Sequence, residues 1–224
     1  MNIGFGVIAT LVLTISVIAA PAHAAPFEVN DYLKMADGPG NTGGSEFLAT
    51  SEGASFITFC LQKTEYINFT DQFLIEDIST YAETDPAGNG GDGLGRDFLE
   101  EETAFLYTQF RLGSLSGYDY GGAGRWLSAN LLQKAIWMFE QEMTFDAGNQ
   151  FVQLATAAVA NGQWTGLGDV RVMNLTLNGK EAQDQLILVP PREITAVPEP
   201  ASLLMLGAGL TVMARYGRRS RRQA

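Results

Sequence analysis

The chain has 224 residues and a formal net charge of −11, with one cysteine, Cys60, and one histidine, His23. A single cysteine excludes an intrachain disulfide. The acidic balance argues against nucleic acid and anionic lipid as partners and favours solubility.

The first 24 residues predict a secretory signal peptide. An apolar run ends in Ala22-His23-Ala24, the small-residue pattern of a cleavage site, so we expect cleavage after Ala24. The alternative is an uncleaved anchor. Cleavage removes His23, and the exported chain then lacks the residues for Ser-His-Asp or Cys-His catalysis and for a zinc site of the usual Cys/His kind.

The exported body, residues 25–192, is expected to form one α+β domain with N-terminal strands, three central helices and a C-terminal β-hairpin. Asp97 is expected to cap the first helix, and the turn Asn178-Gly179 predicts the hairpin. The expected elements are a loop with a possible first strand at Ala25–Glu52, strands at Ala54–Leu61 and Gln72–Tyr81, helices at Phe98–Leu112, Arg125–Met143 and Asn149–Ala160, and strands at Asp169–Leu177 and Gln183–Val189.

Cys60 lies in an apolar run whose alternation predicts a buried strand. Phe56 and Cys60 share one face, and Ile57, Phe59 and Leu61 share the other. Because both faces are apolar, the strand should be covered on both sides and Cys60 should be shielded from water.

The helix expected at Arg125–Met143 carries Gln133 on the flank of a broad apolar face. Gln133 lies one turn before Trp137, so the indole can cover the amide, while Lys134 and Gln141 point to solvent. The apolar face consists of Trp126, Leu131, Leu132, Ala135, Ile136, Phe139 and Met143.

The runs Phe59-Cys60-Leu61 and Leu132-Gln133-Lys134-Ala135-Ile136-Trp137 resemble the cysteine and glutamine motifs of bacterial thioester domains, known from surface adhesins of Gram-positive bacteria. The resemblance implies a buried thioester between Cys60 and Gln133, formed with loss of ammonia and shielded by Trp137, Phe59 and Ile136. Fixed geometry favours its formation, and burial protects it from hydrolysis. It would bind an amine or hydroxyl on a surface or matrix once, without turnover and without a cofactor.

The tail has three parts: Pro198-Glu199-Pro200, an apolar run at Ala201–Ala214, and an arginine-rich end that includes Arg218 and Arg219. This order resembles the PEP-CTERM sorting signal of Gram-negative bacteria, in residues 193–224 with their linker. The resemblance implies transient anchoring in the inner membrane by the short helix, processing by an exosortase, and delivery to the cell surface or the extracellular space. A PEP-CTERM tail in place of a Gram-positive wall anchor shifts the expected target toward an extracellular matrix, another cell or a self surface.

The same residues also fit other functions. A buried cysteine is often a small core residue and a helical glutamine is often solvated, in which case the chain is a structural protein of an exopolysaccharide or biofilm matrix. A glycoside hydrolase with a carboxylate pair and a calcium loop are weaker alternatives, because the acids fit helix ends, solvent faces and solvated loops. Tyr118 and Tyr120 lie in a glycine-rich loop that can contact a ligand or cover the thioester as a lid. The alternative is that they only pack within the loop. The acids concerned are Glu100, Glu101, Glu102, Glu140 and Glu142 for the hydrolase and Asp85, Asn89, Asp92 and Asp97 for calcium.

Overall fold

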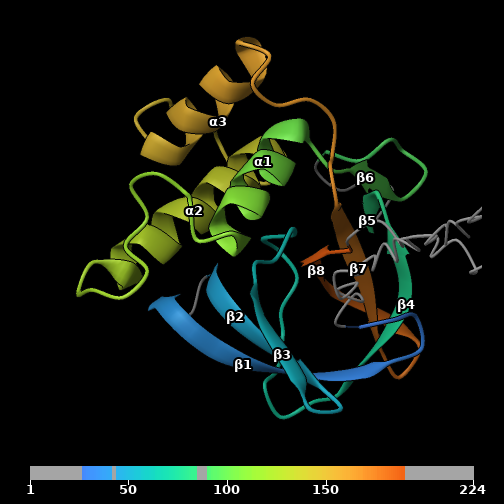
Figure 1. Cartoon of the computed structure of the whole chain (residues 1–224). Helices are drawn as coiled ribbons and strands as arrows, with labels where there is room; N and C mark the ends of the chain where they lie inside the picture. The colour runs from blue at the N-terminus through green and yellow to red at the C-terminus, as the bar shows by residue number, and fades with distance from the viewer. Residues whose placement is uncertain (1–26, 42–43, 85–89, 190–224) are drawn as a thin grey trace, which may run out of the picture. The chain divides into compact units, whose positions relative to one another are not determined.

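Six strands of the computed structural model form one antiparallel sheet (Figure 1). Its spatial order is β3-β2-β1-β4-β7-β8, and a second sheet pairs β5 with β6. The structure describes residues 27–41, 44–84 and 90–189, all within the unit Ala24–Pro191. The strands are β1 Tyr32–Asn41, β2 Gly44–Ser51, β3 Ala54–Thr58, β4 Phe73–Ser79, β5 Tyr81–Glu83, β6 Arg96–Phe98, β7 Val170–Leu177 and β8 Lys180–Leu188.

Three helices follow β6 and precede β7, and they gather on one side of the sheet in Figure 1. They are α1 Glu101–Arg111, α2 Arg125–Phe139 and α3 Gln150–Ala160. Helix α2 contacts both other helices and also β1 and β2, so it joins the helical layer to the sheet. The order of strands, helices and strands confirms the predicted α+β class.

The segment after β3 joins the two edges of the six-stranded sheet. Leu186 donates its N–H to the Phe59 carbonyl, and Leu61 donates its N–H to the Asp184 carbonyl, each over 3.1 Å. Cys60 pairs with Gln185 between these two hydrogen bonds. Since β3 is the first strand in the spatial order and β8 the last, the sheet closes on itself at Cys60.

Two hydrophobic clusters occupy the two faces of the Cys60 segment. Phe59 and Leu61 belong to the cluster that includes much of the three helices, whereas Phe56 and Cys60 belong to the cluster enclosed by the strands. The predicted alternation of faces is therefore confirmed, and Cys60 is completely buried.

The N-terminal part differs from its prediction as a loop with one possible strand, because it forms the hairpin of β1 and β2. Glycines allow the two strands to approach closely: a Cβ on Gly38 would lie 2.6 Å from the Glu46 carbonyl oxygen. In β1, the buried residues Leu33 and Met35 alternate with exposed residues. This alternation is typical of a strand rather than of a loop, and it is the sequence signal that the prediction missed.

The predicted ends of two helices are wrong. Asp97 does not cap α1, because it pairs with Ala82 in the β5–β6 sheet and the helix begins only at Glu101. Helix α2 ends at Phe139 rather than Met143, and Gln141 follows it with a φ of 57°. Trp126, predicted on the apolar face, lies in the first turn of α2 and is 53% exposed, so its predicted burial is wrong.

The predicted C-terminal hairpin is confirmed by the antiparallel pair β7–β8. Asn178 and Gly179 both have positive φ, 54° and 73°, which is the backbone required by the tight turn that Asn-Gly favours. Asn149 caps α3 by accepting the Phe151 N–H over 2.9 Å, close to the predicted start of that helix.

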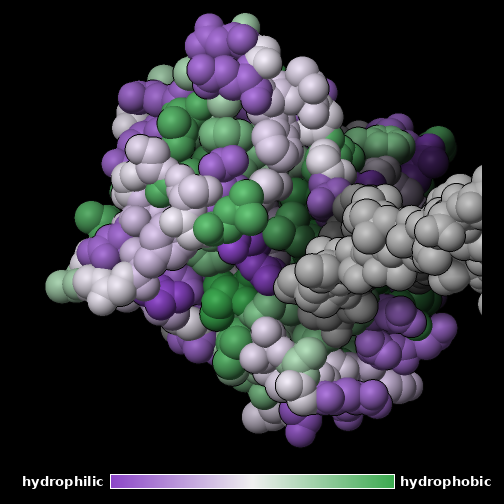
Figure 2. All heavy atoms as spheres, viewed as in Figure 1, coloured by the Kyte–Doolittle hydropathy of each residue, from purple (hydrophilic) through white to green (hydrophobic). Residues whose placement is uncertain are grey.

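The surface mixes hydrophilic and hydrophobic residues, and Figure 2 shows one such face. Within residues 27–41, 44–84 and 90–189, no helix is both long and apolar enough to cross a membrane. The predicted signal peptide and the tail with its short helix lie outside the described residues.

Candidate functional site

The backbone on either side of Cys60 is held by a buried network with β8. Gln62 donates its Nε2 to Asp184 Oδ2 over 3.0 Å, and the Asp184 N–H donates back to Gln62 Oε1 over 2.9 Å. The other carboxylate oxygen of Asp184 accepts the Leu175 N–H over 2.8 Å. Asp184 is 2% exposed, and both of its carboxylate oxygens accept hydrogen bonds. These contacts therefore fix the register of the Cys60 segment against β8.

Helix α2, which carries Gln133, is fixed to the sheet at its first residue. Arg125 contacts the Glu46 carboxylate of β2 through two nitrogens, with Nη2–Oε2 at 2.6 Å and Nε–Oε1 at 2.9 Å. Tyr118 also donates its hydroxyl to Glu46, and Arg125 donates to the Tyr120 carbonyl. Glu46 is completely buried, so this ion pair sets the position of the helix N-terminus.

These two supports bring Cys60 and Gln133 into direct contact. The Sγ of Cys60 lies 3.4 Å from Oε1 of Gln133, and the Cys60 backbone N–H donates to the same oxygen over 3.2 Å. The Gln133 Nε2 donates to the Cys60 carbonyl over 2.8 Å. Gln133 was expected on the helix flank, but it is completely buried, and the three contacts fix its amide against the cysteine.

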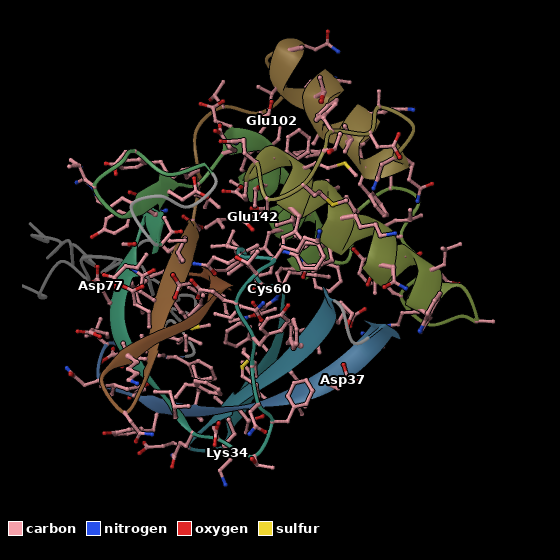
Figure 3. The ribbon with its side chains drawn as sticks, turned by 180° about the vertical axis from the view of Figure 1, so that it is seen from behind. Lys34, Asp37, Cys60, Asp77, Glu102 and Glu142 are labelled. Atoms are coloured by element: carbon pink, nitrogen blue, oxygen red, sulfur yellow. The ribbon has the colours of Figure 1, made fainter. Side chains whose placement is uncertain are left out.

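The surroundings of the Cys60 thiol disfavour its ionisation. Burial raises its pKa far above the ordinary value, and the Glu142 carboxylate raises it further. The Trp137 indole N–H lowers this pKa because it lies near the sulfur, although its geometry is too poor for a hydrogen bond. The sulfur therefore remains protonated at neutral pH. Figure 3 shows Cys60 inside the molecule, with Lys34, Asp77 and Glu102 toward the outside.

The three residues expected to shield the pair are all buried, but they lie on different sides. Trp137, 5% exposed, belongs to the same hydrophobic cluster as Cys60. Phe59 and Ile136 are completely buried in the other cluster, against the opposite face of the segment. Lys134 is exposed, as predicted. Tyr118 and Tyr120 pack on Phe110.

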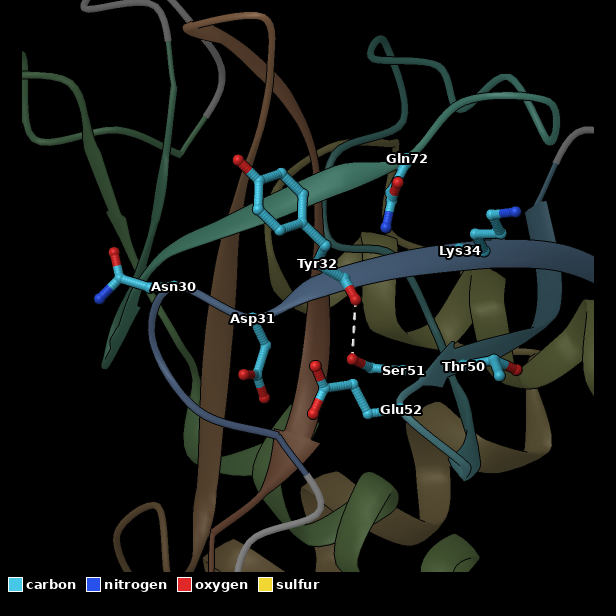
Figure 4. A pocket seen from close by; sticks show the side chains of 8 residues that line it. All are labelled: Asn30, Asp31, Tyr32, Lys34, Thr50, Ser51, Glu52 and Gln72. Atoms are coloured by element: carbon cyan, nitrogen blue, oxygen red, sulfur yellow. Dashed lines mark hydrogen bonds between the residues drawn. The ribbon is translucent and has the colours of Figure 1, made fainter.

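Two surface pockets lie away from this pair. One, of about 360 Å³, is bounded by the ends of β1 and β2, where Ser51 donates its hydroxyl to the Tyr32 carbonyl over 2.7 Å (Figure 4). The other lies on α3, between Phe145 and Asn161. Neither of these two pockets is lined by Cys60 or Gln133.

Three of the acids, Glu100, Glu101 and Glu102, lie at the start of α1, as predicted. The prediction of a solvent face is wrong for Glu140 and Glu142, which are only 2% and 8% exposed. Asp92 forms an exposed ion pair with Arg96 at 2.7 Å, whereas Asp97 is buried. In the described part of the chain, no group of histidine, cysteine or acidic side chains has the arrangement of a metal site; Asp85 and Asn89 lie outside it.

The buried carboxyl of Glu140 predicts a pH-dependent stability. Burial, together with the nearby carboxylates of Asp97 and Glu100, raises the pKa of Glu140 to about 8, from an ordinary value of 4.5. The folded protein therefore keeps a proton that the unfolded chain loses, so the free energy of unfolding falls as the pH rises from 4.5 to about 8. We expect thermal denaturation to show a melting temperature several degrees lower at pH 8 than at pH 5.

Glu140→Gln should reduce this difference, since the amide carries no titrating proton. It should not remove the difference, because burial also raises the pKa of Asp97 and of Glu65 to about 7. Glu52→Gln, at an exposed position, is the control and should keep the parent slope. An equal slope in Glu140→Gln and the parent would contradict the prediction.

Comparison with known proteins identifies the tail. Residues 196–222 match the family model of the PEP-CTERM protein-sorting motif. The chain carries a PEP-CTERM sorting motif. This motif indicates an exported protein that an exosortase processes and whose C-terminus is anchored in the membrane beforehand. Searches of curated proteins and of solved structures found no match, so the resemblance of the body to thioester domains depends on its own residues.

Three supports of the pair were missed from the sequence: Glu46, Gln62 and Asp184. Each is a polar residue that is at most 3% exposed. Only Gln62 offered a signal, because it directly follows an apolar run and a buried polar side chain requires a partner, whereas Asp184 lies between two glutamines and Glu46 follows a serine. Their partners lie far along the chain and cannot be deduced from spacing.

Proposed function

We propose that this exported protein forms an internal thioester between Cys60 and Gln133 and uses it to bind one nucleophile covalently, as a surface or matrix adhesin. The single observation that carries the proposal is the buried contact of the two side chains, with Sγ 3.4 Å from Oε1. Both residues are completely buried, and a thioester needs such a dry site to survive.

The surroundings of the amide support its activation. The Cys60 N–H donates to Gln133 Oε1, the oxygen that gains negative charge when sulfur attacks the amide carbon. The hydrogen bond from Nε2 to the Cys60 carbonyl holds the amide in one orientation. Fixed geometry replaces a slow encounter between a thiol and an amide, which is an unreactive acyl donor.

The two steps balance without a cofactor. In formation, a bond joins Sγ to the Gln133 side-chain carbon, the carbon–nitrogen bond breaks, and the thiol proton leaves with the nitrogen as ammonia. In capture, an amine or hydroxyl attacks the same carbon, the carbon–sulfur bond breaks, and a proton from the nucleophile returns to the sulfur. The product is an amide or ester on residue 133, and the chain acts once rather than as an enzyme.

Intact mass measurement of the purified exported protein tests the proposal. We expect a mass below that of the processed sequence by one ammonia, and acid-phase peptide mapping should locate the loss in a cross-linked pair of peptides that contain Cys60 and Gln133. Methylamine should then add its own mass to the Gln133 peptide and release a thiol that an alkylating reagent labels.

A protein with the unmodified mass and one thiol that is titrated on denaturation would contradict the proposal. That result would instead favour the structural matrix protein, because the PEP-CTERM motif and the fold require no reactive bond.

A further inference from the structure

The indole N–H of Trp137 is buried without a hydrogen-bond partner. Trp137 is 5% exposed, and in the described part of the chain no acceptor meets its Nε1 in hydrogen-bonding geometry. Trp164 provides a contrast, because its Nε1 donates to the Gly166 carbonyl over 2.8 Å. Since a buried indole normally finds such an acceptor, the unpaired donor of Trp137 requires an explanation.

Two sets of hydrogen bonds hold the Cys60 segment along α2 and the residues after it. Gln133 exchanges hydrogen bonds with Cys60, and the Lys63 N–H donates to Glu142 Oε2 over 2.9 Å. Trp137 lies between these two points, one helical turn after Gln133 and on the same face of α2. It therefore lies beside the cysteine, and both residues belong to the same hydrophobic cluster.

The charges around the sulfur give this indole N–H a part in its chemistry. Its proximity lowers the pKa of the Cys60 thiol, as does the cysteine's own backbone N–H less strongly, whereas burial and the Glu142 carboxylate raise this pKa. A thiol is only a weak acceptor, which leaves the indole unpaired while the sulfur is protonated. A thiolate is a far better acceptor, so the N–H of Trp137 gains a partner when the sulfur becomes negatively charged.

We propose that Trp137 is a catalytic residue of the thioester site, whose indole N–H donates a hydrogen bond to the Cys60 sulfur as the carbon–sulfur bond breaks. This inference rests on the proposed function. In capture, the nucleophile bonds to the Gln133 side-chain carbon, and the electron pair of the carbon–sulfur bond moves to Sγ. The indole stabilises this charge and keeps its own proton, and a proton from the nucleophile then converts the thiolate to the thiol.

A catalytic donor and a passive shield predict opposite effects when the indole is changed. If Trp137 only shielded the pair, its loss would admit water and amines, and the thioester would open faster. Loss of a donor to the leaving sulfur slows the opening instead, because the developing charge is then left in an apolar site beside Glu142. The direction of the rate change therefore identifies the role.

The test replaces Trp137 site-specifically by benzothienylalanine, which keeps the bicyclic shape but has a sulfur atom in place of the indole N–H. The purified exported protein is treated with methylamine, and incorporation is followed by intact mass. We expect the rate to fall roughly ten- to hundredfold, the effect of removing a hydrogen bond to a charged group. Trp137→Phe, which keeps an aromatic ring without a donor, should also react more slowly than the parent.

The same replacement at Trp164 is the matched control. It removes an indole N–H that donates to the Gly166 carbonyl, from a side chain packed against the other hydrophobic cluster. The control should therefore show the ammonia loss and the methylamine rate of the parent. The melting temperature of each variant, measured by circular dichroism, shows that it is folded.

The outcomes separate the two proposals. If the parent shows no ammonia loss, both are overturned. If the parent forms the thioester and the Trp137 variants take up methylamine at the parent rate or faster, the role of Trp137 is overturned and the thioester stands. An equal slowing in the Trp164 control also overturns this role. A folded benzothienylalanine variant that keeps its ammonia supports it, because formation starts from the same thiolate.

Discussion

Gln133→Met is expected to abolish covalent capture while leaving the protein folded. Methionine fills a similar volume in this completely buried site but has no acyl carbon for the sulfur to attack. The variant should show no loss of ammonia and no incorporation of methylamine, and Cys60 should be alkylated in full once the chain is denatured. Intact mass before and after methylamine treatment measures each of these results.

Lys134→Met is the matched control, one residue along the same helix on its exposed side. It should show the ammonia loss and the methylamine incorporation of the parent, because it touches neither partner of the pair. Cys60→Ala should fail like Gln133→Met, since an amide without a thiol stays an amide. Methylamine incorporation that persists in Gln133→Met would show that the reactive acyl group is elsewhere.

Of the substitutions proposed for this protein, Arg125→Met is expected to lower the free energy of unfolding the most. It leaves the completely buried Glu46 carboxylate without its cation. Among the described residues, the Tyr118 hydroxyl then remains as the side-chain partner of this carboxylate. Removing one partner of a buried ion pair costs about 3–5 kcal/mol. For a body of this size, the melting temperature should fall by roughly 10 °C in thermal denaturation followed by circular dichroism.

Arg96→Met provides the control, because the Arg96–Asp92 pair has a comparable 2.7 Å contact but an exposed arginine. Exposed pairs contribute about 0–1 kcal/mol, so its melting temperature should change little. Glu46→Leu combined with Arg125→Met should recover part of the loss, since no charge is then left buried. An equal effect at Arg125 and Arg96 would show that burial of Glu46 does not matter.

Much of the fold could be predicted from local sequence patterns. The Asn178-Gly179 turn identified the β7–β8 hairpin, and periodicity located the three helices within a few residues. The β1–β2 hairpin was missed because its glycines are typical of loops, yet here they allow close strand approach. The Asp97 cap was wrong because pairing with Ala82 outweighed the capping preference.

The sequence by itself determined which groups could react and where the chain is sent. It has one cysteine, one glutamine placed a turn before a tryptophan, and a tail that carries the PEP-CTERM motif. These are local features, since each depends on residue identity or on neighbours within a turn or a short run.

Only the tertiary structure decided that Cys60 and Gln133 touch, and what surrounds them. Their contact depends on closure of the sheet between Cys60 and Gln185 and on the ion pair that fixes α2 to β2. Both join segments far apart in the chain, where periodicity and spacing carry no information about partners.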